Sequence, residues 1–237
     1  MGILEVLFPF FIFPVIYASS DCRFSFCGSN SIIIRFPFQL EGEQIPYCGY
    51  PGFNLICTNN SKTVLELPYS GVFYVRNINY LTQKIQVYDP DDCLPKRLLS
   101  LNVSSSPFIY TFTRNFTFLS CPFQNAGSQF IPIDCLSNST HFVSAIPSLN
   151  LPNPLPASCH VITSLFVPVA GPEQQNEVNF KDLVLTWDRP DCRYCESQEQ
   201  LCGFDRNNNN QLFCFSYQTG KDLLYRFTKG LDDLTCT

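Results

Sequence analysis

The chain is poor in charged residues and in the side chains that most enzymes use for catalysis. Only 15% of its 237 residues are charged, and it has two histidines and one methionine. It contains no G-x-S-x-G element, no phosphate-binding loop and no dinucleotide-binding fingerprint. Its net charge of −5 lacks the basic excess of a nucleic-acid-binding domain. We therefore expect a protein that has no catalytic residues, needs no cofactor and binds no nucleic acid.

The N-terminal segment has the pattern of a secretory signal peptide. Residues 3–17 are apolar apart from Glu5, and three small residues, Ala18 to Ser20, follow them. The segment contains two prolines and is shorter than the roughly 20 residues that span a bilayer. We predict cleavage of residues 1–20 and an extracellular, secreted protein, with membrane attachment only through this leader or through a helix further downstream.

Abundant cysteine is the main positive signal after the leader. All 13 cysteines lie beyond it, and disulfides form and persist in an oxidising compartment. Six cysteines allow 15 pairings, so the sequence fixes no individual pair. We expect bridges mostly within residues 22–121 and within residues 135–214, which leaves Cys236 over. The twelve expected disulfide cysteines are Cys22, Cys27, Cys48, Cys57, Cys93, Cys121, Cys135, Cys159, Cys192, Cys195, Cys202 and Cys214.

Four N-x-S/T sequons accompany the cysteines. None has proline at its middle position, so each is an acceptor for N-glycosylation in a secreted protein. We expect these segments to lie on the surface. The four asparagines are Asn59, Asn102, Asn115 and Asn138.

The composition predicts a mainly β fold. Phenylalanine (23) and tyrosine (11) are frequent, and proline and glycine separate short apolar runs. Residues 71–78 and 84–88 alternate apolar and polar, so we expect two neighbouring antiparallel strands with Asn79 near their turn. A weak pattern predicts one helix over 177–184. The expected strands are 32–38, 53–57, 63–67, 71–78, 81–88, 108–119 and 159–169.

The spacing of prolines and cysteines predicts two small cysteine-rich modules behind the signal peptide. Residues 122–158 contain six prolines and no long strand pattern, which is typical of a semi-extended connector. The first module is then 21–121 and the C-terminal module is 159–237. Residues 21–121 carry eight Lys or Arg against seven Asp or Glu, so the first module is the better host for an anion.

Several motifs together resemble a known plant family. CRFSFCG, IIIRFPF, CGYPGFNLIC, VRNINY and YDPDDC resemble, in residues 22–121, the galacturonan-binding extracellular domain of wall-associated receptor kinases. YSGVFYVRNINY, YDPDDCLPKRLLSLN and PIDCLSNST resemble the extracellular part of membrane-anchored RING-type finger proteins. Such proteins continue into a transmembrane helix and a RING with ubiquitin-ligase activity, and we expect this chain to be a form truncated before them.

The resemblance implies pectic polysaccharide, homogalacturonan, as the partner. Binding a polymer of uronates calls for Lys or Arg near the carboxylates and for aromatic rings that pack on the sugars. For each residue alone, a solvated strand face or ordinary packing is the competing interpretation. The glycines and proline of CGYPGF are expected to set a tight turn. The candidate ligand-binding residues are Arg76, Lys84, Lys96, Arg97, Tyr50, Tyr74 and Tyr80.

Metal and catalytic readings of other motifs are weaker. Cys192 and Cys195 have the spacing of a zinc or redox pair, but the secreted context and the absence of a nearby histidine favour disulfides. Asp89, Asp91 and Asp92 suit a solvated turn better than a calcium or glycosidase site. We therefore expect no metal site.

Two other functions stay open beside polysaccharide binding. The chain could be a receptor-type ectodomain that recognises a peptide or a partner protein and binds no glycan. It could also be a fragment of a RING-type E3 ubiquitin ligase whose catalytic part lies outside this sequence.

Overall fold

A computed structural model describes residues 22, 24–28, 32–125, 130, 132–169, 180–205 and 211–216 of the chain. The predicted signal peptide, Cys236 and residues 177–179 of the predicted helix over 177–184 lie outside these residues. Within them, no helix has both the length and the apolar character needed to cross a membrane.

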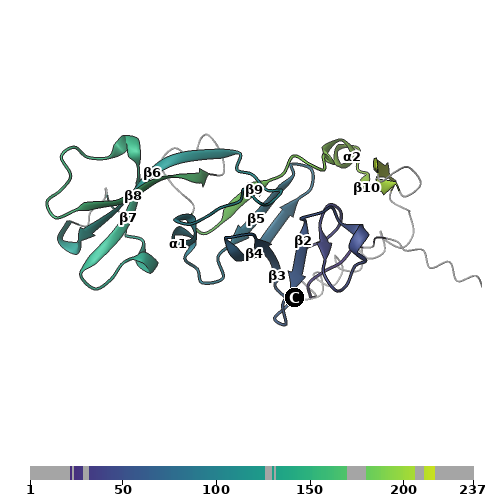
Figure 1. Ribbon diagram of the computed structural model, residues 1–237, viewed down its shortest axis with the longest axis horizontal. Coiled ribbons are helices and arrows are strands. Elements are labelled where there is room, and N and C mark those ends of the chain that lie inside the picture. The colour runs from purple at the N-terminus through teal and green to yellow at the C-terminus, as the bar shows by residue number, and fades with distance from the viewer. Residues whose placement is uncertain are drawn as a thin grey trace, which may run out of the picture.

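The largest element is a six-stranded sheet at the centre of the molecule (Figure 1). Its strand order is β1-β2-β3-β4-β5-β9, with β1 parallel to β2 and the other neighbours antiparallel. The mainly β fold expected from the sequence is confirmed. The strands are β1 (Gln39–Leu40), β2 (Asn54–Cys57), β3 (Thr63–Leu67), β4 (Gly71–Asn79), β5 (Lys84–Tyr88) and β9 (Leu183–Thr186).

A second sheet and a terminal hairpin flank this central sheet on opposite sides (Figure 1). The second sheet has the order β7-β6-β8, with β6 (Phe112–Pro122) between β7 (His141–Pro147) and β8 (His160–Val169). The hairpin joins β10 (Leu201–Asp205) and β11 (Gln211–Phe215). The helices are short: α1 (Leu94–Leu98), α2 (Arg193–Ser197) and the 3-10 turns η1 (Pro46–Cys48), η2 (Phe123–Asn125), η3 (Asp134–Leu136) and η4 (Ser148–Asn150).

Most of the predicted strands are present. The segment 63–67 is a strand at its predicted bounds, and β4 and β5 form the expected antiparallel pair. The strand expected over 32–38 is wrong, because only Ile34 makes an isolated bridge there and Pro37 has no N–H to donate to a strand ladder. The described end of the predicted helix is also wrong, since Leu183 and Val184 belong to β9.

The division into two modules joined by a connector differs from the structure. β9 lies in the predicted C-terminal part but pairs with β5, where Leu185 is opposite Ile85. The predicted connector contains β7, which pairs with β6 along its whole length. Alternating burial explains the position of β9: Leu183 and Leu185 are buried while Val184 is not, as a half-buried sheet strand requires.

Six disulfides join the twelve predicted cysteines. Four lie within the expected halves: Cys22–Cys48, Cys27–Cys57, Cys192–Cys202 and Cys195–Cys214. Two cross the expected boundary, Cys93–Cys135 and Cys121–Cys159. The crossing bridges tie α1 to η3 and β6 to the start of β8, so the middle of the chain is part of the folded structure.

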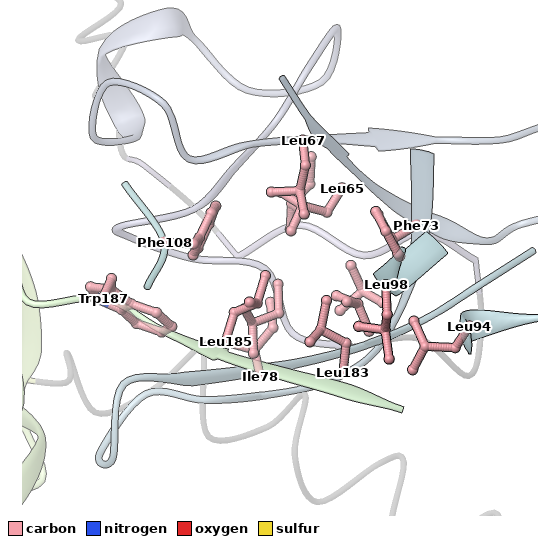
Figure 2. Close-up of a cluster of buried hydrophobic side chains, with 14 of the residues drawn as sticks. Leu65, Leu67, Phe73, Ile78, Leu94, Leu98, Phe108, Leu183, Leu185 and Trp187 are labelled. Carbon is pink, nitrogen blue, oxygen red and sulfur yellow. The ribbon is translucent and has the colours of Figure 1, made fainter. Parts of the chain in front are cut away.

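The core of the central sheet takes side chains from distant parts of the sequence. Figure 2 shows Leu183, Leu185 and Trp187, from β9 and the residue after it, beside Phe73 and Phe108. The Trp187 ring also meets Phe38 and Phe53 edge to face. Each of these side chains is at most 2% exposed, so each contributes on the order of 1.5–3 kcal/mol of burial free energy.

A buried ion pair attaches α2 to the central sheet. The Arg35 guanidinium donates to both carboxylate oxygens of Glu196, with Nη2 2.6 Å from Oε2, and lies over the Tyr80 ring. The two charged side chains are only 13% and 9% exposed. Gln83 fixes the adjacent chain: its Nε2 donates to the Trp187 carbonyl, and its Oε1 accepts from the Cys192 amide, both at 2.7 Å. The C-terminal cysteine-rich hairpin is therefore held against the first part of the chain.

Candidate functional site

The outward face of β4, β5 and β9 gathers polar and aromatic side chains. Residues at alternate positions of a strand point to one face, so Lys84, Gln86 and Tyr88 lie on the face opposite the buried Ile85 and Val87. Tyr74 is directly opposite Tyr88, and their ring centroids are 5.5 Å apart. We refer below to the β4–β5–β9 face, which consists of Tyr74, Arg76, Lys84, Gln86, Tyr88 and Asp182.

A β-bulge places Arg76 on this face. The register shifts between Val75 and Asn77, so Arg76 is an extra residue that opposes no residue of β5. Bulges re-aim side chains and often occur next to functional sites. The Arg76 side chain is 49% exposed, and its guanidinium lies 4.4 Å from the centre of the Tyr88 ring. The bulge thus presents a cation stacked on an aromatic ring.

Asp182, just before β9, holds Arg76 in this position. Arg76 Nε donates to Asp182 Oδ1 at 2.6 Å, and Gln86 Nε2 donates to Asp182 Oδ2 at 3.0 Å. Arginine has five N–H donors, and four of them are on the two Nη atoms. These Nη atoms make no hydrogen bond within the part of the chain that the structure describes. The two Nη atoms form the fork that can bind a carboxylate in two-point fashion, on a side chain that is half exposed.

Lys96 and Arg97 lie on α1 and have different environments. Lys96 is exposed. Arg97 Nη2 donates to the Val72 carbonyl at 2.6 Å, its guanidinium lies over the Phe73 ring, and its Nε is 3.4 Å from Asp89 Oδ1. Arg97 thus packs between α1 and the start of β4, and the structure gives it a structural role.

Tyr50 and Tyr80 belong to the packing of the molecule. Tyr80 is 9% exposed; its hydroxyl donates to the Ile33 carbonyl, and burial raises the pKa of Tyr80 above its ordinary value. Tyr50 stacks on Phe204 of the C-terminal hairpin. The two rings lie away from the β4–β5–β9 face and connect the first part of the chain to its C-terminal part.

The CGYPGF motif forms the expected tight turn. The Phe53 amide donates to the Tyr50 carbonyl at 3.0 Å, and Gly52 has a φ of +87°, which favours glycine. The motif therefore forms a backbone turn between two disulfide cysteines, Cys48 and Cys57.

One of the three aspartates after β5 holds the turn that leads into α1. Asp89 is buried, and its Oδ2 accepts from the Cys93 amide at 3.0 Å, while Asp91 and Asp92 are exposed. Cys192 and Cys195 both take part in disulfides. Among the described residues, no group of three or more His, Cys, Asp or Glu could hold a metal ion.

Three members of the site were missed from the sequence. Gln86 and Tyr88 follow from the alternation of β5, which carries Lys84, so the pattern could have included them. Asp182 gave no local signal, because its place depends on the pairing of β9 with a strand about a hundred residues earlier.

Comparisons with known proteins give one family match and several similar relatives. Residues 22–89 match the family described as wall-associated receptor kinase galacturonan-binding. The chain is 43% identical over 221 residues to RING-H2 finger protein ATL21A of Arabidopsis thaliana, and 42% identical over 222 residues to ATL22 of the same plant. These alignments cover 90% of this chain in both cases, and 59% and 58% of the relatives.

A receptor-type kinase is also similar to the chain. Rust resistance kinase Lr10 of Triticum aestivum is 26% identical over 234 residues, which cover 81% of this chain and 37% of the kinase. The chain spans about three fifths of the length of the two RING-H2 relatives. No solved structure matches the chain.

The matched segment contains β2 to β5 and so all of the β4–β5–β9 face except Asp182. Residues 22–89 of this chain therefore match the wall-associated receptor kinase galacturonan-binding family, and the chain as a whole is similar to RING-H2 finger proteins.

Proposed function

We propose that this chain is an extracellular pectin-binding module and that the β4–β5–β9 face binds de-esterified galacturonan. The observation that carries the proposal is the bulge arginine, Arg76, whose side chain is half exposed while its guanidinium packs on Tyr88. A uronate carboxylate can accept two hydrogen bonds from such a fork. Lys84 adds a second cation on the same face, and the Tyr74 and Tyr88 rings supply apolar surface for sugar rings.

The role proposed for the chain is binding and not catalysis. Its relatives include RING-H2 finger proteins and a kinase, and we propose that it serves such a protein as the part that faces the cell wall. Localisation on the outer side of the membrane agrees with the family matched by residues 22–89 and with six disulfides.

Removing the two cations should weaken binding. We expect the Arg76→Ala, Lys84→Ala double variant to bind oligogalacturonide about tenfold more weakly or worse, because a hydrogen bond to a charged group contributes about 1.5–3 kcal/mol and 1.4 kcal/mol is tenfold. Titration calorimetry at low salt measures the loss. Arg193→Ala is the matched control, since Arg193 is also an exposed arginine paired to an aspartate, but on α2. If the double variant and the wild type bind with equal affinity, Arg76 and Lys84 do not take part in ligand binding.

Neutralising Asp182 should have the opposite effect. Asp182→Asn retains an oxygen that can accept from Arg76 but removes the negative charge that competes with a uronate. We expect the affinity for oligogalacturonide to rise about fivefold, because two unit charges 4 Å apart interact by roughly 1 kcal/mol in water. Asp191→Asn, in the exposed Asp191–Arg193 pair, is the control and should leave affinity unchanged. An equal rise in both variants would indicate only a change in net charge, and a fall with Asp182→Asn would contradict the proposed site.

A further inference from the structure

One sequon asparagine lies directly opposite an exposed phenylalanine on the second sheet. Asn115 of β6 pairs with Phe166 of β8. Two residues along each strand, Thr117 and Ser164 are also a pair, and their hydroxyl oxygens are 2.9 Å apart, so opposed residues here share one face. Asn115 and Phe166 therefore point to the same side of the sheet as this hydroxyl pair.

The Phe166 ring is conspicuously uncovered. It is 69% exposed, although it stands in the middle of a regular strand, and Asn115 beside it is exposed as well. Side chains opposed in an antiparallel pair have Cβ atoms about 4.5–5.5 Å apart. A group attached to the Asn115 amide would start within reach of the ring. β7 ends at Pro147, opposite Phe116, so it provides no strand residue opposite Asn115.

We propose that Asn115 carries an N-linked glycan whose first N-acetylglucosamine packs on the Phe166 ring. Asn115 and Thr117 are the acceptor and the hydroxyl residue of a sequon. The sugar presents C–H groups and an acetyl methyl to the ring and keeps its hydroxyls in water. The glycan thus covers an apolar side chain that the polypeptide leaves exposed, and this role is independent of pectin binding on the central sheet.

The modification transfers an oligosaccharide from a lipid-linked pyrophosphate donor to the side-chain nitrogen of Asn115. A bond forms between the side-chain nitrogen of Asn115 and the anomeric carbon of the first sugar, the bond from that carbon to the pyrophosphate oxygen breaks, and the nitrogen loses one proton. The lipid pyrophosphate leaves with the electron pair. Thr117 is buried in the folded protein, so the transfer precedes the folding of β6.

The four sequons are not equivalent in this respect. Asn59 lies in the turn between β2 and β3, and the other members of its sequon, Asn60 and Ser61, are exposed polar residues. A glycan at Asn59 has no ring opposite it in a strand register. Asn59→Gln is therefore the matched control for Asn115→Gln, since both remove one sequon from an exposed asparagine.

The test is a double-variant cycle on the secreted, glycosylated protein, with melting temperature as the readout and peptide mass spectrometry for occupancy. We expect Asn115 to be occupied and Asn115→Gln to lower the melting temperature by about 2–4 °C, the scale of one modest contact in a chain of this size. In a Phe166→Ala background, Asn115→Gln should cause no further loss. Asn59→Gln should change the melting temperature less than Asn115→Gln does.

A second readout uses the wild-type protein and so does not depend on the secretion of a variant. Enzymatic trimming to a single N-acetylglucosamine should leave the melting temperature unchanged, while complete removal of the glycans should lower it. The proposal is overturned if Asn115 is unoccupied, if the effects of Asn115→Gln and Phe166→Ala simply add, or if trimming to one sugar destabilises as much as complete removal.

Discussion

Glu196→Ala is expected to lower the free energy of unfolding by about 3–5 kcal/mol. Glu196 and Arg35 are each less than one-sixth exposed, so removing the carboxylate deletes both hydrogen bonds that the largely buried guanidinium donates to it. Breaking a buried ion pair from one side has costs of this size. The variant should weaken the contact between α2 and the segment before β1, where the Arg35 guanidinium also lies over the Tyr80 ring. Urea unfolding of the oxidised protein measures the change.

The control for this variant is a second ion pair on the same helix. Asp191 and Arg193 are about half exposed, and exposed pairs typically contribute under about 1 kcal/mol. Asp191→Ala should therefore change stability by less than about 1 kcal/mol. If Glu196→Ala changes it no more than Asp191→Ala, the buried pair does not hold the C-terminal hairpin in place.

The fragment 21–121 is expected not to fold by itself. It lacks β9, and with it the buried Leu183, Leu185 and Trp187 of the central core (Figure 2). It also leaves Cys93 and Cys121 without their partners, Cys135 and Cys159. Two lost disulfides at about 2–5 kcal/mol each, together with the missing side chains, exceed the 5–15 kcal/mol by which domains are typically stable.

Near-UV circular dichroism and denaturant unfolding would show this failure. The fragment should give no cooperative transition, whereas the whole chain should give one. A fragment that unfolds cooperatively would restore the two-module interpretation, in which residues 21–121 form an independent domain. The ligand experiments proposed above accordingly use the whole chain and not the first part alone.

Local patterns were enough to predict β3, β4 and β5, but not β9. The alternation in β4 and β5 predicted their pairing, and the apolar run over 63–67 predicted β3. The cysteine count predicted that twelve residues form disulfides. It also suggested two equal halves, because each half of the chain holds six cysteines, and pairs such as Cys93–Cys135 carry no local signature.

The candidate site was only partly predictable for the same reason. Asp182, just before β9, reaches Arg76 only through the long-range pairing of β9 with β5, whereas the bulge at Arg76 lies within the neighbouring β4–β5 pair. Tyr50 and Tyr80 were candidates because tyrosine has both apolar and polar atoms, which suit a sugar and a buried packing site equally. Burial separates the two roles: the hydroxyl of Tyr80 is bonded to the backbone at Ile33, whereas Tyr74 and Tyr88 lie on the open face.

The most direct measurement of the central proposal compares two ligands of equal length on the wild-type protein. Oligogalacturonide and its fully methyl-esterified form share the same sugar rings, but only the first has carboxylates for Arg76 and Lys84. We predict that the acid form binds, with an affinity that falls as salt rises because the charges on the β4–β5–β9 face are exposed to screening. The ester should bind at least about tenfold more weakly. Equal binding of the two forms, or no binding of the acid form at low salt with and without calcium, would contradict the account.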